Sequence, residues 1–340
     1  MSTSKSTEPG SAPVPGRSPG APPDDTGPSA ARRAKGVLLS HWREYMSIAP
    51  FFVLFAAFGV IPLVYALYLS TLQWDGLSEP EFVGLEQWAR LFETSDVLTA
   101  VGNTAVIFLF GQVPVVVGAL VAATLLSQRR LRFRGLYQTA FFLPQVTSVV
   151  AVTIVFQSLF ANQYGFVNNI LGTLGLPAQE WLSDPWKMKL VIALMVIWRG
   201  FGYFLLLFMA GISAIDRSVL EAAQIDGAGP VRSFRSIILP LLAPTMVFVT
   251  LTGAIAGVQI FTEPQVLFAQ TGSSGGPNNG GLTMMLLQYE YLGGIGSSGT
   301  NQLVKPDLGF AAVIGWVIFL TLVLLALLNN RLLRRSFGDR

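Results

Sequence analysis

The chain has 340 residues, of which 52% are hydrophobic and 12% are charged, and its formal net charge at pH 7 is +3. Soluble domains carry about twice this fraction of charged residues, so the composition excludes an ordinary soluble enzyme or binding module. The absence of cysteine excludes disulfides, thiol catalysis and cysteine-based metal sites. With a single histidine as well, we expect no metal site and no cofactor bound by this chain.

The first part of the chain differs in composition from the rest. Residues 1–36 are rich in Pro, Gly, Ser and Ala and contain few large apolar side chains, so they cannot bury a core and should be disordered. We therefore divide the chain into a disordered tail, a first transmembrane helix with its outer loop, a transmembrane core and a basic C-terminus. These segments are 1–40, 41–96, 97–330 and 331–340.

Six long apolar runs follow the tail. Each is long enough to cross a bilayer, which takes roughly 20 residues of helix. A backbone inside lipid has to satisfy its own hydrogen bonds, so these runs should be helices. The sequence predicts an all-α polytopic membrane protein with six transmembrane helices. The runs are Ile48–Leu72, Val101–Leu126, Leu136–Phe160, Met188–Ala210, Leu241–Phe261 and Phe310–Leu328.

The placement of basic residues predicts the orientation. Most of the 22 Lys and Arg residues lie in 1–47, 127–135, 211–240 and 329–340, and cytoplasmic loops are enriched in such residues. We expect a multi-pass protein of the cytoplasmic membrane with both termini cytoplasmic. Runs such as "QRRLRFR" can also bind nucleic acid, but these runs flank membrane helices, so we expect lipid and no nucleic acid as their partner.

Polar residues inside the spans indicate a pathway rather than a simple anchor. Arg199 lies near the middle of the fourth run, where an arginine costs about 2.5–3.5 kcal/mol on insertion scales and should face the bundle interior or water. Two interpretations remain open. Arg199 could contact a solute, or it could be a structural arginine paired with an acid or with carbonyl groups at a helix end.

Three more side chains are candidates for the same pathway. Gln259 and Glu263 are four residues apart, which would place them on one face of a continuous fifth helix. Tyr203 is one turn from Arg199 and could stack on a sugar ring or simply pack in the bundle. Prolines inside the spans, at Pro62 and Pro144 among others, predict kinks.

The Gly-rich stretch Thr271–Gly281, "TGSSGGPNNGG", resembles a phosphate-binding loop only in its glycines. A P-loop needs a Lys followed by Ser or Thr after the glycines, and Gly-Lys-Ser/Thr occurs nowhere in this chain. We interpret the stretch as a flexible external loop. If ATP drives transport here, another chain has to hydrolyse it.

The cytoplasmic segment 211–240 contains "EAAQIDGAG" (Glu221–Gly229). Ser218 and Glu221 have the spacing of a capping box, which predicts a short helix from about Val219. Gly227 should end this helix, and Pro230 suits the first turn of a second one. The result is a helix–turn–helix elbow.

The composition of the short helix leaves two functions open. Ala222 and Ala223 are small enough for another protein to approach closely, and Glu221 and Asp226 supply charge beside them. The segment is therefore either a docking helix for a partner or a plain connector.

The spacing from Glu221-Ala222-Ala223 through Gly227 to "Ile237-Ile-Leu239-Pro240" resembles the EAA motif of binding-protein-dependent ABC importer permeases. The resemblance covers about Ile48 to Arg335. Further stretches are similar to the carbohydrate-uptake branch, which includes maltose-type and glycerol-3-phosphate-type permeases. These stretches are Arg134–Pro144, Gly165–Leu176, Trp181–Pro185 and Ile197–Ile215.

The resemblance implies a type I ABC importer permease with a cytoplasmic coupling helix in its EAA loop, 211–240. In that family the coupling helix inserts into a cleft of a cytoplasmic ATPase, which binds ATP and Mg²⁺. Glu221, Ala222, Ala223, Asp226 and Gly227 would form the docking helix here. The expected partners are two ATPase subunits, a second and non-identical permease subunit, and an extracytoplasmic solute-binding protein.

The expected cargo is a sugar or oligosaccharide. The first alternative is glycerol-3-phosphate or another polyol phosphate, for which a cationic pathway would be favourable. A secondary carrier would need buried titrating carboxylates and would leave the EAA elbow unexplained. An intramembrane enzyme would need a catalytic constellation, and the spans contain none. We expect no catalytic residue in this chain.

Overall fold

A computed structural model describes residues 42–127, 133–269, 275–294 and 306–337. It divides into two compact units, Met1–Ile61 and Pro62–Arg340. The described part of the first unit is helical and comprises α2 (Trp42–Phe55) and the π-turn η1 (Ala56–Val60). The tail at 1–40 and most of the basic run at Gln128–Arg134 lie outside the described residues.

Five of the six apolar runs form spans of the expected kind. Within the described ranges, five helices are long and apolar enough to cross a membrane, and a bent pair, Arg134–Val146 with Val149–Leu159, raises this to six if it counts as one span. The five spans are Tyr45–Leu69, Ser95–Leu126, Pro185–Ser213, Ala243–Phe268 and Leu308–Arg331, and a short break after Val258 divides the fourth of them.

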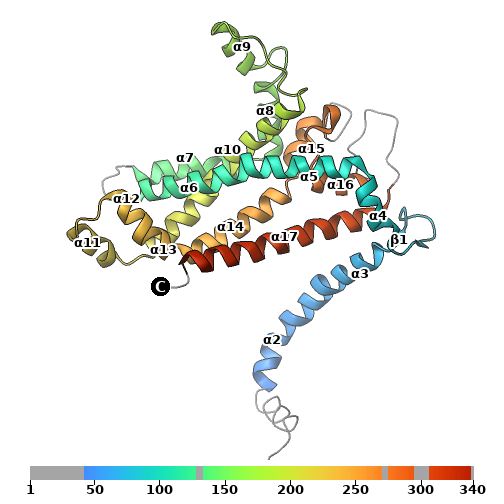
Figure 1. The fold of residues 1–340 in the computed structure, drawn as a ribbon, viewed down its shortest axis with the longest axis horizontal. Coiled ribbons are helices and arrows are strands. Elements are labelled where there is room, and N and C mark those ends of the chain that lie inside the picture. Colours follow the sequence, from blue (N-terminus) through green and yellow to red (C-terminus); the bar gives the residue numbers. More distant parts are fainter. Residues whose placement is uncertain (1–41, 128–132, 270–274, 295–305, 338–340) are drawn as a thin grey trace, which may run out of the picture. The chain divides into compact units, whose positions relative to one another are not determined.

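Short elements connect these helices within the second unit (Figure 1). A two-residue antiparallel ladder pairs Leu72 with Phe82. In chain order the elements are α3 (Ile61–Leu69), β1 (Leu72–Gln73), β2 (Glu81–Phe82), α4 (Glu86–Glu93), α5 (Ser95–Ile107), η2 (Phe108–Gln112), α6 (Val113–Leu126), α7 (Arg134–Val146), α8 (Val149–Leu159), α9 (Phe166–Thr173), α10 (Pro185–Ser213), α11 (Arg217–Ile225), α12 (Pro230–Ser233), η3 (Phe234–Ile238), α13 (Leu239–Leu241), α14 (Ala243–Val258), α15 (Thr262–Phe268), η4 (Pro277–Asn279), α16 (Met284–Tyr291) and α17 (Leu308–Phe337).

Several of the predicted kinks take the form of π-turns. A proline has no N–H to donate, and its ring clashes with the carbonyl four residues earlier, so a wider turn just before it relieves the conflict. Each of the three π-turns in the described ranges ends two residues before a proline. The prolines are Pro62, Pro114 and Pro240.

The third predicted span has a different shape from the one expected. A single helix over Leu136–Phe160 is wrong, because α7 and α8 meet at an angle of 93°. Thr147 (φ −74°, ψ 143°) and Ser148 (φ −54°, ψ 127°) are extended and interrupt the helix three residues after Pro144. Membrane proteins tolerate such a break only where protein or water satisfies the freed backbone groups.

The α7 helix packs closely on α10 because Gly202 has no side chain. A Cβ at Gly202 would overlap the carbonyl oxygen of Phe141 in α7. Small residues at such positions let membrane helices approach each other closely.

One end of the second unit carries β1, β2, α4, α16 and the start of α17, and we call it the cap end; α11 lies at the opposite, elbow end (Figure 1). At the cap end, Arg90 of α4 forms a 2.6 Å ion pair with Asp307. Asp307 also accepts a 3.0 Å hydrogen bond from the Phe310 backbone N–H, and the Arg90 guanidinium lies 4.4 Å from the centre of the Phe310 ring. These contacts join α4 to the start of α17.

The Gly-rich stretch is only partly within the described residues, because Thr271–Ser274 lie outside them. The prediction of a flexible loop is wrong for Gly275–Gly281. This segment contains η4, and a Cβ at Gly275 or Gly276 would lie within 2.8 Å of Leu282 or Phe268, respectively. The glycines therefore allow tight packing in this conformation.

Substituting Gly202 tests the close packing of α7 on α10. Gly202→Ala should destabilise the folded chain by about 1–3 kcal/mol, because an overpacked contact pushes backbone against backbone. The control is Gly200→Ala in the same helix, where the nearest atom would lie 3.7 Å away. Thermal unfolding of the two purified variants measures the effect. Equal melting temperatures would contradict a close contact between α7 and α10 at Gly202.

Stability should depend on pH through Glu290, at the end of α16. Burial and, secondarily, the nearby Asp96 raise the pKa of Glu290 from 4.5 to about 7. Between pH 4.5 and about 7, Glu290 is ionised in the unfolded chain but still protonated in the folded chain. The free energy of unfolding therefore falls as pH rises through this range. Glu290→Gln should flatten this part of the melting curve against pH, whereas Glu86→Gln, an exposed control, should not.

Candidate functional site

An ion pair joins the middle of α10 to the first turn of α15. Arg199 Nη1 lies 3.2 Å from Glu263 Oε1, and the two side chains are 28% and 13% exposed. Arg199 Nε is buried without a hydrogen-bond partner within the described part of the chain. The pairing of Arg199 with an acid is therefore confirmed, whereas a contact with a solute stays a prediction.

The expected arrangement of Gln259 and Glu263 is wrong. Helix α14 ends at Val258, Phe261 has a φ of −139° and a ψ of −56°, and α15 begins at Thr262. Gln259 and Glu263 thus lie on either side of a helix break and do not share a helix face. Gln259 is exposed, and Glu263 meets Arg199 because the break redirects the chain.

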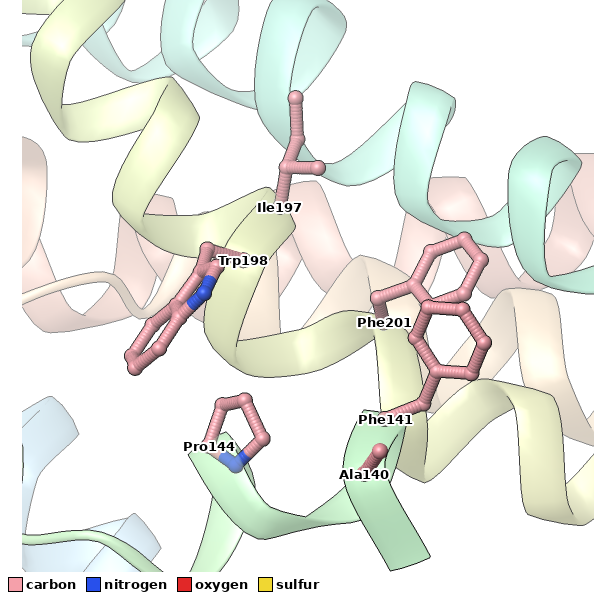
Figure 2. A pocket seen from close by; sticks show the side chains of 6 residues that line it. All are labelled: Ala140, Phe141, Pro144, Ile197, Trp198 and Phe201. Atoms are coloured by element: carbon pink, nitrogen blue, oxygen red, sulfur yellow. The ribbon is translucent and has the colours of Figure 1, made fainter. Parts of the chain in front are cut away.

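An open apolar pocket of about 390 Å³ lies between α7 and α10. Figure 2 shows the rings of Trp198, Phe141 and Phe201 around it, with Pro144 at its edge. Its six lining residues are Ala140, Phe141, Pro144, Ile197, Trp198 and Phe201.

We did not predict Trp198 and Phe141 from the sequence. Their positions in the sequence could have pointed to them, because Trp198 directly precedes Arg199 and Phe141 is three residues before Pro144. The predicted Tyr203 does not line this pocket. Its ring packs edge-on against Phe204, with centroids 5.2 Å apart.

The elbow forms as a short helix followed by a tight turn. Asp216 caps α11 by accepting a 2.9 Å hydrogen bond from the Ser218 N–H, so the predicted cap at Ser218 is wrong by two residues. Hydrogen bonds from Ser218, backbone first and hydroxyl second, lower the pKa of Asp216. Asp216 precedes the first helical residue directly, and an N-cap residue occupies that position.

The end of α11 follows the prediction. Gly227 has a φ of +76°, which glycine adopts without strain. The Gly227 N–H donates to Gln224 O at 3.1 Å, and the Ala228 N–H donates to Ala223 O at 2.9 Å. These two bonds define a Schellman motif. Pro230 then begins α12, as expected.

The exposed surface of α11 is apolar on one side. Val219 is 42% exposed and Ile225 is 87% exposed, and the exposed Ala222 lies between them at helical spacing. Ala223, in contrast, is only 6% exposed, so its side chain is covered by the chain itself. The accessible surface of the elbow therefore contains Ala222 rather than Ala223.

The elbow, the broken spans and the apolar helices can be compared with known proteins. The profile of the family described as "Binding-protein-dependent transport system inner membrane component" matches residues 114–338. This chain belongs to that family.

The permease is also similar to individual sugar transport proteins. It is 34% identical to the lactose transport system permease protein LacF of Rhizobium radiobacter, over 84% of this chain and 92% of the relative. It is 33% identical to the arabinooligosaccharides transport system permease protein AraP of Halalkalibacterium halodurans, over 83% of this chain and 85% of the relative.

The fold has a match among solved structures. A chain of the bacterial alginate ABC transporter, crystallised with an alginate pentasaccharide-bound periplasmic protein, superposes with a TM-score of 0.69 at 20% identity and covers 90% of this permease and 98% of that chain. The expected importer permease fold is thereby confirmed.

Proposed function

We propose that this permease is the membrane subunit of an ABC importer that carries a sugar or oligosaccharide across the cytoplasmic membrane. The observation that carries the proposal is the exposed, capped elbow with Glu221-Ala222-Ala223 and Gly227, which lies inside the segment that matches the family. The sugar relatives match most of the chain. They support a carbohydrate cargo.

The elbow is suited to dock an ATPase subunit on the cytoplasmic side. Asp216 caps the start of α11 and the turn at Gly227 fixes its end. The apolar stripe of Val219, Ala222 and Ile225 leaves room for a partner to approach the backbone at Ala222. Glu221 and Asp226 are exposed beside the stripe and supply charge for fixing the register of the partner. ATP and Mg²⁺ would bind to the ATPase chains.

The elbow end and the cap end of the second unit then have different roles. With the elbow end and both termini cytoplasmic, the cap end faces outward and receives solute from an extracytoplasmic binding protein. A second permease subunit completes the route. The exposed apolar surfaces of the spans, such as Val117, Val121 and Leu125 in α6, fit lipid or that subunit.

The solute route is proposed to run past Arg199, Glu263 and Trp198. Exposed aromatic rings such as Trp198 can stack on the apolar faces of sugar rings, while the partly exposed Arg199 guanidinium can donate to a hydroxyl group. The ion pair with Glu263 offsets the charge of Arg199, which favours a neutral sugar over glycerol-3-phosphate or another polyol phosphate. It also leaves no free carboxylate here for a secondary carrier. Tyr203, which packs on Phe204, is a weaker candidate.

Ala222→Trp tests the docking helix. The bulky ring should block approach to the elbow, so the ATPase should be lost on purification and ATP-driven uptake with it. The variant should still insert in the membrane, because the substitution lies on an exposed surface. Quantifying the co-purified ATPase measures the effect.

The matched control is Gln224→Trp, which adds the same bulk at an exposed position on the other side of α11. It should retain the ATPase. Normal recovery of the ATPase with Ala222→Trp would show that the elbow is a connector.

Arg199→Gln and Glu263→Gln test the solute route. Each leaves the other charge unpaired in a partly buried site. Breaking a fully buried pair costs about 3–5 kcal/mol and this partly exposed pair should cost less, but both variants should still lower the yield of folded complex. The double variant should restore much of that yield. If the route is as proposed, the restored complex should still show weakened uptake at unchanged ATPase content. Full uptake by the double variant would assign the pair a structural role alone.

A further inference from the structure

The segment Gly275–Leu282, which we call the cap turn, has a strained backbone. Asn278 and Asn279 are adjacent and both have a φ of +54°. Phe133 is the one other non-glycine residue in the described ranges with a positive φ. Left-handed backbone is unfavourable for L-residues, although Asn tolerates it better than most. Such strain persists where surrounding contacts impose it, and it is concentrated in switch regions and binding sites.

The contacts that impose this conformation come from α5 and α10. Asn103, which is 4% exposed, donates from Nδ2 to Asn279 O at 2.8 Å and to Leu282 O at 3.0 Å. Its Oδ1 accepts a 2.8 Å hydrogen bond from Lys189 Nζ in α10. Asn279 Nδ2 in turn donates to Asp96 Oδ1 of α5 at 3.1 Å.

The cap turn fills the space between three helices. A Cβ at Gly280 would lie 2.7 Å from Pro185 Cα at the start of α10. A Cβ at Gly281 would overlap the ring of Phe268 in α15. The turn therefore wedges between α5, α10 and α15, and α10 and α15 are also the helices joined by the Arg199–Glu263 pair.

We propose that the cap turn is a latch that closes the solute route at the cap end, held shut by Asn103 and Asp96 and released once in each transport cycle. The inference rests on the proposed function, since it needs a solute route between these helices. Hydrogen bonds of Asn103 and Asp96 and the close packing of the glycines hold the closed turn, and relief of the strain at Asn278 and Asn279 favours its release. A turn that only stabilised the fold would gain nothing from this strain.

Cross-linking the latch tests the inference in the complete transporter. The chain has no native cysteine, so Asp96→Cys with Asn279→Cys can be bridged selectively by a short, reducible bifunctional thiol reagent. Bridging should lower solute uptake by at least about tenfold, as expected when an opening step is blocked, and reduction should restore it. The control is Asn162→Cys with Ser183→Cys, another pair of contacting side chains (2.6 Å), whose bridging should leave uptake unchanged.

Complete bridging of Asp96→Cys and Asn279→Cys with unchanged uptake would overturn the latch. If no sugar is taken up before bridging, even by the wild-type complex, the proposed function fails instead, so the two failures are distinguishable.

A second variant covers the case in which the cysteine pair does not assemble. Asn278 is exposed and its side chain makes no hydrogen bond to the other described residues, so Asn278→Gly relieves strain while leaving the latch contacts in place. This should stabilise the closed turn and slow uptake at saturating solute by about threefold or more. An unchanged rate at normal complex yield would contradict a strained latch.

Discussion

Backbone groups inside a bilayer have no water to bond, so the protein itself has to satisfy every break in a membrane helix. The irregular backbone of this permease is held by polar side chains from neighbouring helices. Thr283 Oγ1 donates to Ile260 O at 2.8 Å, at the break between α14 and α15, and Gln157 Nε2 donates to Leu267 O at 3.3 Å in the short helix that follows. Polar residues at these positions are therefore part of the architecture rather than isolated anomalies.

The two ends of the second unit satisfy their free backbone groups in different ways. At the elbow end, Asp216 and the Schellman motif at Gly227 satisfy the ends of α11 locally, which gives a stiff element that can transmit movement. At the cap end, Asn103 satisfies carbonyl groups that are distant in sequence, so its contacts can be exchanged when helices move. A stiff element at one end and separable contacts at the other fit a transporter driven from the elbow side.

The sequence was informative wherever a property is local. The roles of Gly227 and Pro230 depend on their own backbone and were predicted correctly. The apolar runs were predicted correctly as helical segments, but the breaks within the third and fifth runs were not. Features that depend on a neighbouring helix were not predicted from the sequence. The break after Val258 places Glu263 against Arg199, whereas a continuous helix would have joined Glu263 to Gln259. Asp216 and Ser218 are both good capping residues, so only the geometry of the turn decides between them.

The proposed coupling links ATP hydrolysis at the elbow end of this permease to sugar entry at the cap end. The most direct measurement is uptake of a labelled oligosaccharide into proteoliposomes that contain the purified transporter with its ATPase and second permease. Uptake should require ATP on the elbow side and the solute-binding protein on the cap side. Uptake driven by an ion gradient without ATP, or with the binding protein supplied on the elbow side, would contradict the account.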